Sequence, residues 1–514
     1  MTSSGQERAQ QAGVLLFGKI VSTLGEAVVP IIMIRLLSKA EVGVLSTVMM
    51  LYTTLALVLT SAFPATLMYF LPAREAPERR ALAVRMSRLM LLLGGILAVL
   101  MFALGLVGVT LGGASLAAEH SERSLLDPKA LFYLLALSPY PLGDLPARLL
   151  PNLLVIEGRA RDAATIGVVK AVGSAVATLI PIALGFPLHV VIACTSLFGL
   201  AYSALLPYYL RVLYRDVPKV PAPVSSREII RFTMPLGITD VVGRLNSELD
   251  RYLIAGTFPV TRVAEYRAAA WQVPIIKEIP YTVGRVDTPH LNRLFDAGKV
   301  REAIQLWRAS TEKVALLVVP LASIFIVAAE EVVVLLFTDE YLGAAPVFRL
   351  YSLLMLGRAC SFGNVLLASG KPGYVFQAAL FSFLTNIALS GTALFAFGFI
   401  GPALGTVVAF AALTFYYCWL IAKSTKIRLS ETFPLFAYGR IVATASVASI
   451  PAVLIKFNAG MGPGLTLVAV AAVLLGAFGV LGTLTRQIQR EDWRFLGQWL
   501  SGGFARANAR PSGG

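Results

Sequence analysis

Charged residues are scarce in this 514-residue chain, at 14% of the sequence, whereas 57% of the residues are hydrophobic and the mean hydropathy is +0.75. That balance excludes an ordinary soluble domain, in which about a quarter of the residues are charged. Apolar runs of about 20 residues recur from end to end, and each is long enough to cross a bilayer as a helix. The sequence therefore predicts an all-α integral membrane protein.

Cysteine and histidine are rare as well, with three residues of each. Cys194, Cys360 and Cys418 lie inside apolar runs without any paired spacing, so we expect neither a disulfide nor a metal site, and no motif indicates a cofactor. The opening MTSSGQERAQQ is polar, and no small-residue cleavage site follows the first apolar run. A cleavable signal peptide is therefore not expected.

The apolar runs number about fourteen, although charges dilute the first, seventh and eighth. They lie near residues 13–37, 43–71, 87–112, 129–152, 163–185, 188–213, 232–257, 264–290, 313–337, 343–369, 374–399, 401–422, 437–456 and 463–485. Loop 72–88 carries five arginines against two glutamates, and loops 211–231 and 423–440 have the same excess of three positive charges. The positive-inside rule places these alternate loops and both termini in the cytoplasm, which requires an even number of spans, twelve or fourteen.

The net charge of +15 does not require a nucleic-acid partner. Basic cytoplasmic loops that face anionic membrane lipid account for it, and no nucleic-acid-binding motif accompanies the charge. We therefore expect membrane lipids, and not nucleic acid, as the partners of the basic surface.

Two of the predicted spans, 232–257 and 264–290, carry far more charge than a helix facing lipid tolerates. At 100° per residue the polar side chains form one stripe on each span, although Pro274 and Pro280 bend the second. The stripes contain Asp240, Arg244, Ser247, Glu248 and Arg251 on the first span, and Arg267, Glu278, Tyr281 and Arg285 on the second. An ionised group at bilayer depth costs about 2.5–3.5 kcal/mol or more unless it faces water or a partner, so the stripes predict a wet cavity. The alternative is that i,i+4 pairs such as Arg244 and Glu248 merely neutralise one another.

An internal repeat with a period of about 212 residues organises the chain. NLLVIEGR at residues 152–159 aligns with NVLLASGK at 364–371, and a Gly-Phe pair follows in each copy. Because the offset spans an even number of helices, the two copies have the same orientation in the membrane. We predict an N-terminal lobe of spans 1–6 (1–215) and a C-terminal lobe of spans 7–12 (228–425). The two are parallel six-helix lobes around a central cavity. Two additional spans (437–485) follow, and then an interfacial helix with a disordered tail (486–514).

Four segments carry a resemblance to a known family. They are LNSELDRY at 245–252 followed by VAEY at 263–266, LLFTDEY at 335–341, LASGKP at 367–372 and RLLSKAEVG at 35–43. In this order and at these spacings the chain resembles the polysaccharide flippase family, which includes O-antigen and exopolysaccharide flippases, within the multidrug/oligosaccharidyl-lipid/polysaccharide exporter superfamily. The resemblance implies a non-enzymatic inner-membrane flippase that moves an undecaprenyl-pyrophosphate-linked oligosaccharide by alternating access coupled to a cation gradient. A polysaccharide polymerase and a chain-length regulator are the partners that it implies.

A lipid-linked sugar presents a pyrophosphate, and cationic side chains bind phosphate oxygens. The candidates for this contact are Arg244, Arg251, Arg267, Lys277 and Arg285, together with Lys19, Arg148 and Lys170 from the first lobe; Arg148 also has Asp144 at i,i+4. Coupling to H⁺ or Na⁺ requires an intramembrane carboxylate, for which Glu26, Asp240, Glu248 and Glu278 are the candidates. Asp250 and Glu265 are nearer the external turn, where a helix-end or latch role is at least as well supported.

Other functions are compatible with parts of this pattern. A multidrug/cation antiporter or a peptidoglycan-precursor flippase of the same superfamily uses the same architecture. A membrane glycan polymerase or ligase typically needs a large external catalytic loop, whereas the longest external loop here is about 113–130, where His120 and Glu122 are best explained as solvated residues. A scaffold that transports nothing leaves the charged spans unexplained.

Overall fold

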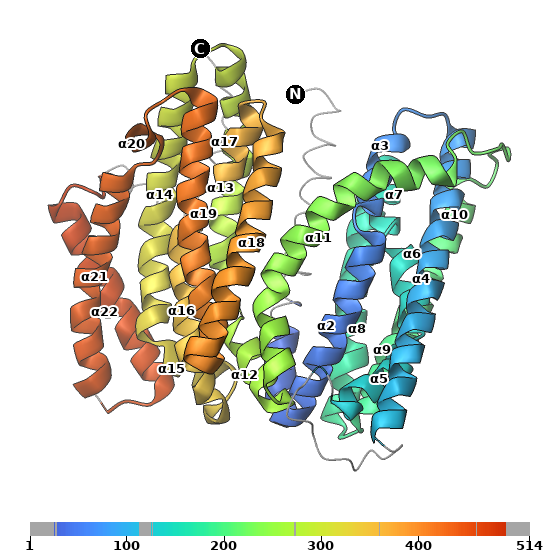
Figure 1. Cartoon of the computed structure of the whole chain (residues 1–514), viewed down its shortest axis with the longest axis horizontal. Helices are drawn as coiled ribbons and strands as arrows, with labels where there is room; N and C mark the ends of the chain where they lie inside the picture. The colour runs from blue at the N-terminus through green and yellow to red at the C-terminus, as the bar shows by residue number, and fades with distance from the viewer. Residues whose placement is uncertain are drawn as a thin grey trace. The chain divides into compact units, whose positions relative to one another are not determined.

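The computed structural model describes residues 25, 28–112, 125, 127–271, 274–358, 360–458 and 460–489. Every regular element within these ranges is a helix (Figure 1), and nine helical segments in them are long and apolar enough to cross a membrane. The predicted all-α membrane fold is confirmed, and the number of spans stays a prediction. The chain divides into two compact units, each built from two stretches of sequence.

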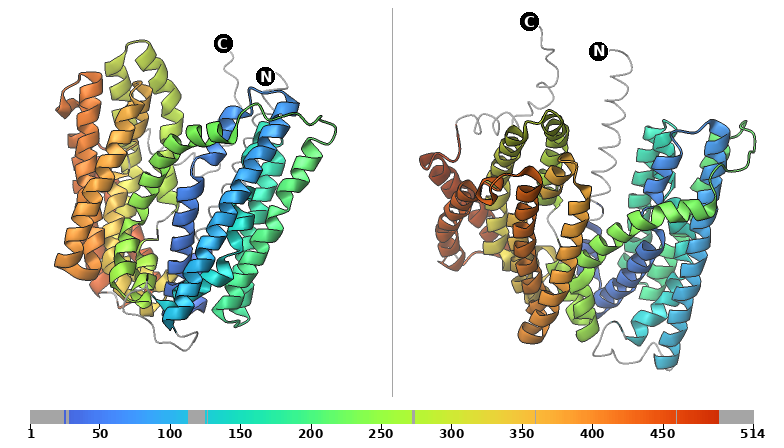
Figure 2. Two further views of the ribbon diagram at one scale, coloured as in Figure 1. Left: turned by 45° about the vertical axis from the view of Figure 1, so that its right-hand side comes forward. Right: turned by 45° about the horizontal axis from the view of Figure 1, so that its top comes forward.

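Unit 1 comprises Met1–Pro274 and Ala379–Ala409. Its helices are α2 (Lys39–Thr60), α3 (Phe63–Phe70), α4 (Ala76–Gly112), α5 (Pro128–Leu137), α6 (Tyr140–Ala147), α7 (Leu150–Ile156), α8 (Ala160–Ala183), α9 (Leu188–Ser203), α10 (Leu205–Leu213), α11 (Ser226–Thr257) and α12 (Val260–Ala269). Helix α4 packs along α5 and α6, α9 lies against α6 and α8, and α12 packs on α2. Further views of the bundle show α4 running along its length (Figure 2).

Unit 2 comprises Ile275–Ala378 and Phe410–Gly514. Its elements are α13 (Pro274–Asp296), α14 (Val300–Val327), α15 (Ala329–Leu336), η2 (Asp339–Ala344), α16 (Ala345–Gly357), α17 (Phe362–Ala368), α20 (Leu429–Thr432), α21 (Leu435–Asn458) and α22 (Pro463–Leu484). Helices α18 (Pro372–Phe397) and α19 (Gly401–Thr425), joined by η3 (Gly398–Ile400), each contribute one part to either unit. Helices α21 and α22 pack on each other and on α14, and Lys456 of α21 forms ion pairs with Glu330 (2.6 Å) and Glu331 (2.9 Å) of α15.

Helices α11 and α12 belong to unit 1 together with the preceding helices, and α12 packs on α2. The lobe boundaries predicted from the repeat, at 215 and 228, stay predictions. So does the interfacial helix within 486–514, most of which lies outside the described residues.

Local sequence explains where several helices begin and end. Ser38 and Glu41 form a capping box at the start of α2, in which each side chain accepts from the other residue's backbone N–H. Gly158 after α7 and Gly370 after α17 have φ of +76° and +72°, a left-handed conformation that closes a helix end with little strain when the residue is glycine. The two turns aligned in the predicted repeat therefore share one backbone conformation.

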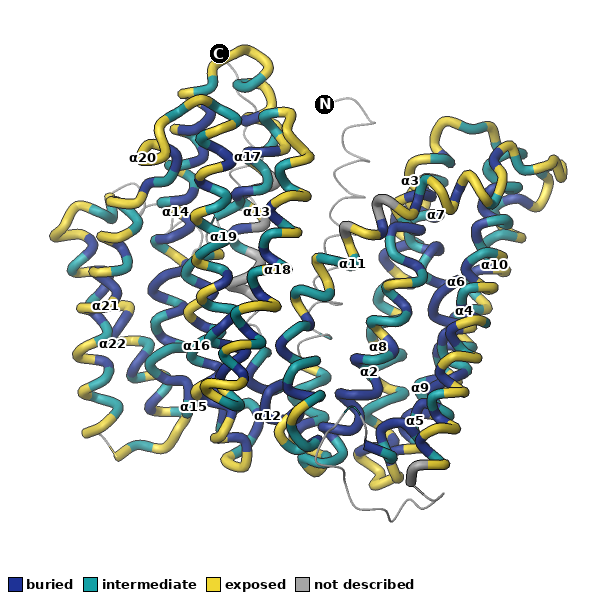
Figure 3. The backbone as a smooth tube through the Cα atoms, viewed as in Figure 1, coloured by how far each residue is buried: buried dark blue, intermediate teal, exposed yellow. Residues whose placement is uncertain are grey.

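The exposed face of several long helices is apolar. Helix α4 exposes Leu92 and Val99, and α21 exposes Leu454 and Phe457. Figure 3 shows exposed positions along the outer sides of α4, α21 and α22. Side chains of this kind are stable against lipid tails, as expected of membrane-spanning helices.

Candidate functional site

Unit 1 contains a cavity of about 600 Å³, bordered by Gly25, the helical segment 28–36 and helices α2, α8, α9, α11 and α12. Among the residues that the structure describes, its charged lining consists of four cations and one carboxylate, namely Lys170, Arg244, Arg251, Arg267 and Glu248. Hydroxyl groups of Ser46, Thr53, Ser174, Thr178 and Thr195 lie among the mostly apolar remainder. A cavity of this size and charge is suited to an anionic ligand that also has neutral polar groups.

Glu248 forms the centre of one wall. Its side chain is 8% exposed; Arg251 Nη1 lies 2.6 Å from Glu248 Oε2, and Arg244 Nη2 lies 3.3 Å from Oε1. All three residues belong to α11 at i,i+3 and i,i+4 spacings, which places them on one helix face. Because the side chain of Arg244 is 55% exposed, this pair remains open on one side.

Arg267 lies near the end of α12 and lines the same cavity. Arg251 and Glu248 line the same cavity, but Arg267 forms no hydrogen bond or ion pair with any residue that the structure describes. The close packing of α12 on α2 fixes its position, because Gly43 approaches the backbone of Val260 too closely to accommodate a Cβ atom. The cavity thus holds one guanidinium group that forms no ion pair within the described ranges.

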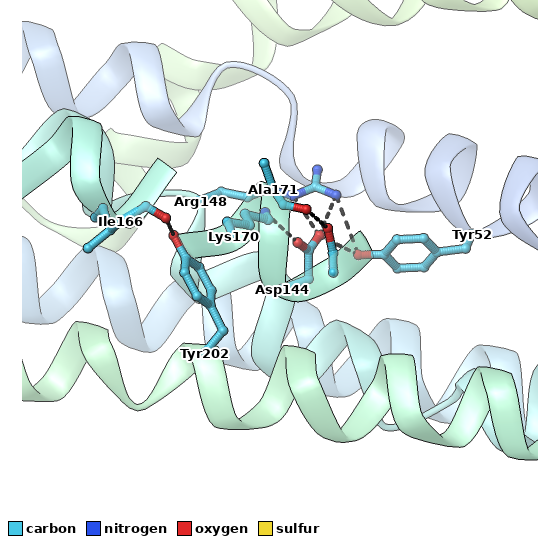
Figure 4. A network of polar contacts seen from close by, with 8 residues as sticks. Tyr52, Asp144, Arg148, Ile166, Lys170, Ala171 and Tyr202 are labelled. Carbon is cyan, nitrogen blue, oxygen red and sulfur yellow. Dashed lines mark hydrogen bonds and ion pairs between the residues drawn. The ribbon is translucent and has the colours of Figure 1, made fainter. Parts of the chain in front are cut away.

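A second carboxylate, Asp144 on α6, is the centre of a separate network (Figure 4). Arg148 donates to its Oδ2 from Nε (2.9 Å) and Nη2 (2.7 Å), Tyr52 donates to the same oxygen (2.6 Å), and Lys170 donates to Oδ1 (2.9 Å). The ammonium group of Lys170 also lies 5.7 Å from the centre of the Tyr202 ring. Lys170 therefore connects this buried network with the cavity that it lines.

A third polar cluster surrounds Asp250 within unit 1. Thr406 Oγ1 lies 2.8 Å and 2.7 Å from the two Asp250 oxygens and 2.9 Å from Asn386 Oδ1. Asn386 Nδ2 donates to Asn246 Oδ1 (3.0 Å), and Ser390 donates to Asn386 Oδ1 (2.8 Å). Sequence reasoning missed this cluster, although polar residues in the apolar runs 374–399 and 401–422 were a signal for it.

The structure separates the predicted site residues into groups. Arg244, Arg251, Arg267 and Glu248 meet in the cavity, whereas Arg148 pairs with Asp144 and is not part of the lining. Asp240 is exposed and accepts a hydrogen bond from Ser61 (3.3 Å). Glu265 forms ion pairs with Lys39 (3.0 Å) and Arg262 (2.8 Å). The described residues do not include Lys19 and Glu26, and the side chains of Lys277, Glu278 and Arg285 also lie outside the description.

The second predicted stripe is interrupted. Helix α12 ends at Ala269 and α13 begins at Pro274, so Arg267 and Arg285 do not share one continuous helix. Proline disfavours helical geometry in the residue before it and suits the first turn of a new helix, so Pro274 starts a helix where we expected only a bend.

Comparison with known families gives two matches. The family described as polysaccharide biosynthesis protein matches residues 9–280, more than half of the chain. The family described as lipid II flippase MurJ matches residues 279–471. The uncharacterized membrane protein MJ1068 of Methanocaldococcus jannaschii is 28% identical over 216 residues, which are 39% of this chain and 41% of that protein. The match thus spans less than half of that relative's length.

Solved structures of transporters have the same fold. An inward closed structure of the lipid II flippase MurJ has a TM-score of 0.69 at 13% identity, covering 93% of this chain and 98% of that one. An inward-facing multidrug resistance MATE family transporter of the MOP superfamily has a TM-score of 0.58 at 19% identity, covering 79% and 96%. A MOP superfamily transporter from Pyrococcus furiosus has a TM-score of 0.54 at 17% identity, covering 83% and 96%.

These likenesses confirm the resemblance drawn from the motifs. The apolar helices make the chain a multi-pass membrane protein, and its fold is that of the lipid II flippase and multidrug transporter structures. The match over residues 9–280 shows that the chain belongs to the polysaccharide biosynthesis protein family.

Proposed function

We propose that the protein is a flippase that moves an undecaprenyl-pyrophosphate-linked oligosaccharide across the bacterial inner membrane for cell-surface polysaccharide biosynthesis. The observation that carries the proposal is the excess of cations in the unit 1 cavity, where the described lining has four basic side chains and one carboxylate. Such an excess is costly inside a membrane unless an anion balances it, and a pyrophosphate supplies that charge. Membership in a family of polysaccharide biosynthesis proteins makes a glycan the natural cargo.

Each part of the cavity fits one part of this substrate. Arg267, which forms no ion pair with the described residues, and the open side of Arg251 bind the phosphate oxygens, because guanidinium groups match phosphate in a bidentate geometry. Lys170 adds an ammonium group from α8. The hydroxyl groups of α2, α8 and α9 offer hydrogen bonds to sugar, while the apolar lining and the surrounding lipid accommodate the polyprenyl tail.

Coupling to a cation gradient requires a carboxylate that changes its partners. Glu248 and Asp250 are both buried on α11, and each has a different environment. Protonation of Glu248 would release Arg244 and Arg251 to the pyrophosphate, which couples transport to H⁺. Asp250 is surrounded by hydroxyl and amide oxygens, which suit Na⁺ instead. Transport by Glu248→Gln and Asp250→Asn, measured as a function of pH and of Na⁺, distinguishes the two ions. Coupling to H⁺ through Glu248 predicts that Glu248→Gln loses the pH dependence and Asp250→Asn keeps it. Coupling to Na⁺ through Asp250 predicts that Asp250→Asn loses the Na⁺ dependence and Glu248→Gln keeps it.

A deletion strain tests the function itself. We expect loss of surface polysaccharide and accumulation of lipid-linked repeat units inside the cell, both reversed by the wild-type gene. Normal surface polysaccharide with an altered drug resistance would instead assign the protein to the multidrug branch. Pull-down of a polysaccharide polymerase and a chain-length regulator from the same membranes tests the expected partners.

Arg267→Ala tests the site, and Arg262→Ala is its matched control on the same helix. Arg262 pairs with Glu265 and does not line the cavity. Loss of a charge-assisted contact to phosphate costs about 1.5–3 kcal/mol, so we expect export to fall at least about tenfold in Arg267→Ala and less than about twofold in Arg262→Ala. Equal export by both variants at equal membrane abundance would refute the assignment of Arg267.

A peptidoglycan-precursor flippase is the second candidate, because the lipid II flippase family matches residues 279–471 and a MurJ structure has the same fold. This cargo has the same pyrophosphate and a different glycan, so the cavity charges serve both. Growth decides between them: a peptidoglycan-precursor flippase is required for viability in cells without a second such flippase, whereas a strain lacking only surface polysaccharide grows.

A further inference from the structure

A basic groove lies outside the cavity, at the start of α4 and beside loop 214–225, all within unit 1. Among the described residues, its charged lining consists of four cations and no acid, namely Arg80, Arg85, Arg88 and Lys219. Arg80 donates to the backbone oxygen of Val217, and Arg85 donates to that of Val224 (2.5 Å), so these two arginines hold the loop against the helix. Arg88 and Lys219 are exposed and have no hydrogen-bond or ion-pair partner within the described ranges.

The groove continues into an apolar one along the same helix. Arg88 and Leu92 line both parts, which have volumes of about 790 and 710 Å³. The apolar part consists of Leu91, Leu92, Gly95, Ile96 and Val99. Helical spacing places residues 88, 92, 95, 96 and 99 on one face, and the leucine and valine at 92 and 99 are 61% and 70% exposed. A Cβ atom at Gly95 would meet only the tip of Leu142, 4.0 Å away, so this face is open there.

We propose that this groove binds one anionic phospholipid of the cytoplasmic leaflet. Its phosphate lies between Arg88 and Lys219, and an acyl chain lies over Leu92, Gly95, Ile96 and Val99. Charge complementarity at one end and an apolar face at the other match the two chemical parts of such a lipid, in the order in which they occur from the interface inward. The bound lipid joins α4 to the loop that leads into α11, and α11 carries three of the charged cavity residues.

A general excess of cytoplasmic positive charge does not account for this arrangement. Arg211 and Arg215 are equally exposed and lie beside or within the same loop, but they do not line the groove. The four groove cations instead come from a helix and a loop that are far apart in sequence. Arg80 and Arg85 hold that loop against the helix. The site is also separate from the proposed transport cavity, since the two share no lining residue.

The test uses the purified full-length protein in detergent, titrated with phosphatidylglycerol or phosphatidylcholine and examined by native mass spectrometry. We expect one phosphatidylglycerol to be retained over phosphatidylcholine. Each cation near a membrane surface contributes about 1 kcal/mol, so Arg88→Gln with Lys219→Gln is expected to lower the affinity about 30-fold. Arg211→Gln with Arg215→Gln removes the same charge outside the groove and is expected to lower it less than about threefold.

Gly95→Phe fills the apolar part without changing the charge, and we expect it to weaken phosphatidylglycerol retention as well. Equal losses in the two double variants would overturn the proposal, because net charge alone would then explain binding. Displacement of the lipid by millimolar glycerol 3-phosphate would overturn it in favour of a free-phosphate site. One-for-one displacement by undecaprenyl pyrophosphate at lower concentration would assign the groove to the transport substrate. Thermal unfolding of each variant confirms that the protein compared is folded.

Discussion

Two buried carboxylates of unit 1 are each four residues from an arginine partner and have contrasting surroundings. Asp144 and Arg148 are at i,i+4, as are Arg244 and Glu248. Asp144 receives donors from three segments, because Tyr52 of α2 and Lys170 of α8 join Arg148, the residue that follows α6. The ion-pair partners of Glu248 both belong to its own helix.

The difference shows that spacing along a helix identifies a pair and not its role. A buried carboxylate with both oxygens occupied by donors from several helices fixes those helices relative to one another. Glu248 has its ion-pair partners on one helix, and Arg267, a third guanidinium in the same cavity, forms no ion pair with the described residues. This arrangement leaves cations available to a ligand. We therefore interpret Asp144 as structural and Glu248 as part of the transport machinery.

Asp144→Asn tests the structural half of this comparison and has the largest expected effect on stability. The substitution leaves Arg148 and Lys170 beside a neutral amide in a buried site, and removing one partner of a buried pair costs about 3–5 kcal/mol. Because both cations are partly exposed, we expect the unfolding free energy to fall by about 3 kcal/mol. Denaturation in detergent measures this loss directly or as a lower Tm.

The control for Asp144→Asn is Glu302→Gln. Glu302 pairs with Lys299 at i,i+3, and both side chains are 55% exposed, so the expected cost is below about 0.5 kcal/mol. A cost for Asp144→Asn as small as this control would show that the Asp144 network does not hold its helices together. Asp144 would then differ from Glu248 only in its place in the fold, and not in how strongly it stabilises the protein.

Glu248→Gln tests the other half, where we expect a smaller loss of stability and a larger change in ligand binding. Arg244 and Arg251 are 55% and 33% exposed, so water in the cavity compensates for the lost charge and the expected cost is about 1 kcal/mol. Removal of the competing carboxylate frees two guanidinium groups for the substrate. We expect the affinity for a pyrophosphate-linked lipid to rise about tenfold, measured with purified protein, while export falls because the cargo is released slowly.

Weaker binding of the pyrophosphate-linked lipid to Glu248→Gln would contradict this role. Glu248 would then be needed to hold Arg244 and Arg251 in place, as Asp144 holds its partners. Glu248→Ala with equal or weaker affinity would support the same correction. Either result would remove the contrast between the two carboxylates.

The contacts within one helix could be predicted from the sequence. Helical periodicity placed Arg244, Glu248 and Arg251 on one face, and the scarcity of charge elsewhere indicated a membrane protein in which such a face must be hydrated. Composition, the repeat and the motifs were enough for the fold class and the family, because both depend on features distributed over the whole chain.

The contacts between residues that are far apart in the sequence could not be predicted in this way. Lys170 reaches Asp144 across 26 residues, and Thr406 reaches Asp250 across 156, distances over which periodicity carries no information. Local spacing equally gives no reason why Arg267, one of several cations in residues 244–285, forms no ion pair with the described residues. Tertiary packing decides each of these cases.

Glu157 provides a third carboxylate, outside the predicted spans, with which the comparison can be sharpened. It accepts a hydrogen bond from Tyr214 (2.9 Å) and forms an ion pair with Arg79 (3.0 Å), so it resembles Asp144 in having partners from separate segments. Burial, and then the hydrogen bond to Glu157, raise the pKa of the Tyr214 phenol above its ordinary value of 10.0. The folded protein therefore keeps this proton at a pH where the unfolded chain loses it.

The sign of the resulting pH dependence follows from linkage. A group whose pKa is raised by folding contributes its full stability below its unfolded pKa and loses that contribution as pH rises towards the folded value. We expect the unfolding free energy of the wild type to decrease more steeply above pH 10 than that of Tyr214→Phe, because phenylalanine has no proton to lose. Below pH 9 the difference between the two proteins should be constant, at about 1 kcal/mol for the lost hydrogen bond. Parallel curves above pH 10 would mean that Tyr214 titrates alike in both states, and Glu157 would then resemble the open site of Glu248 more than the closed one of Asp144.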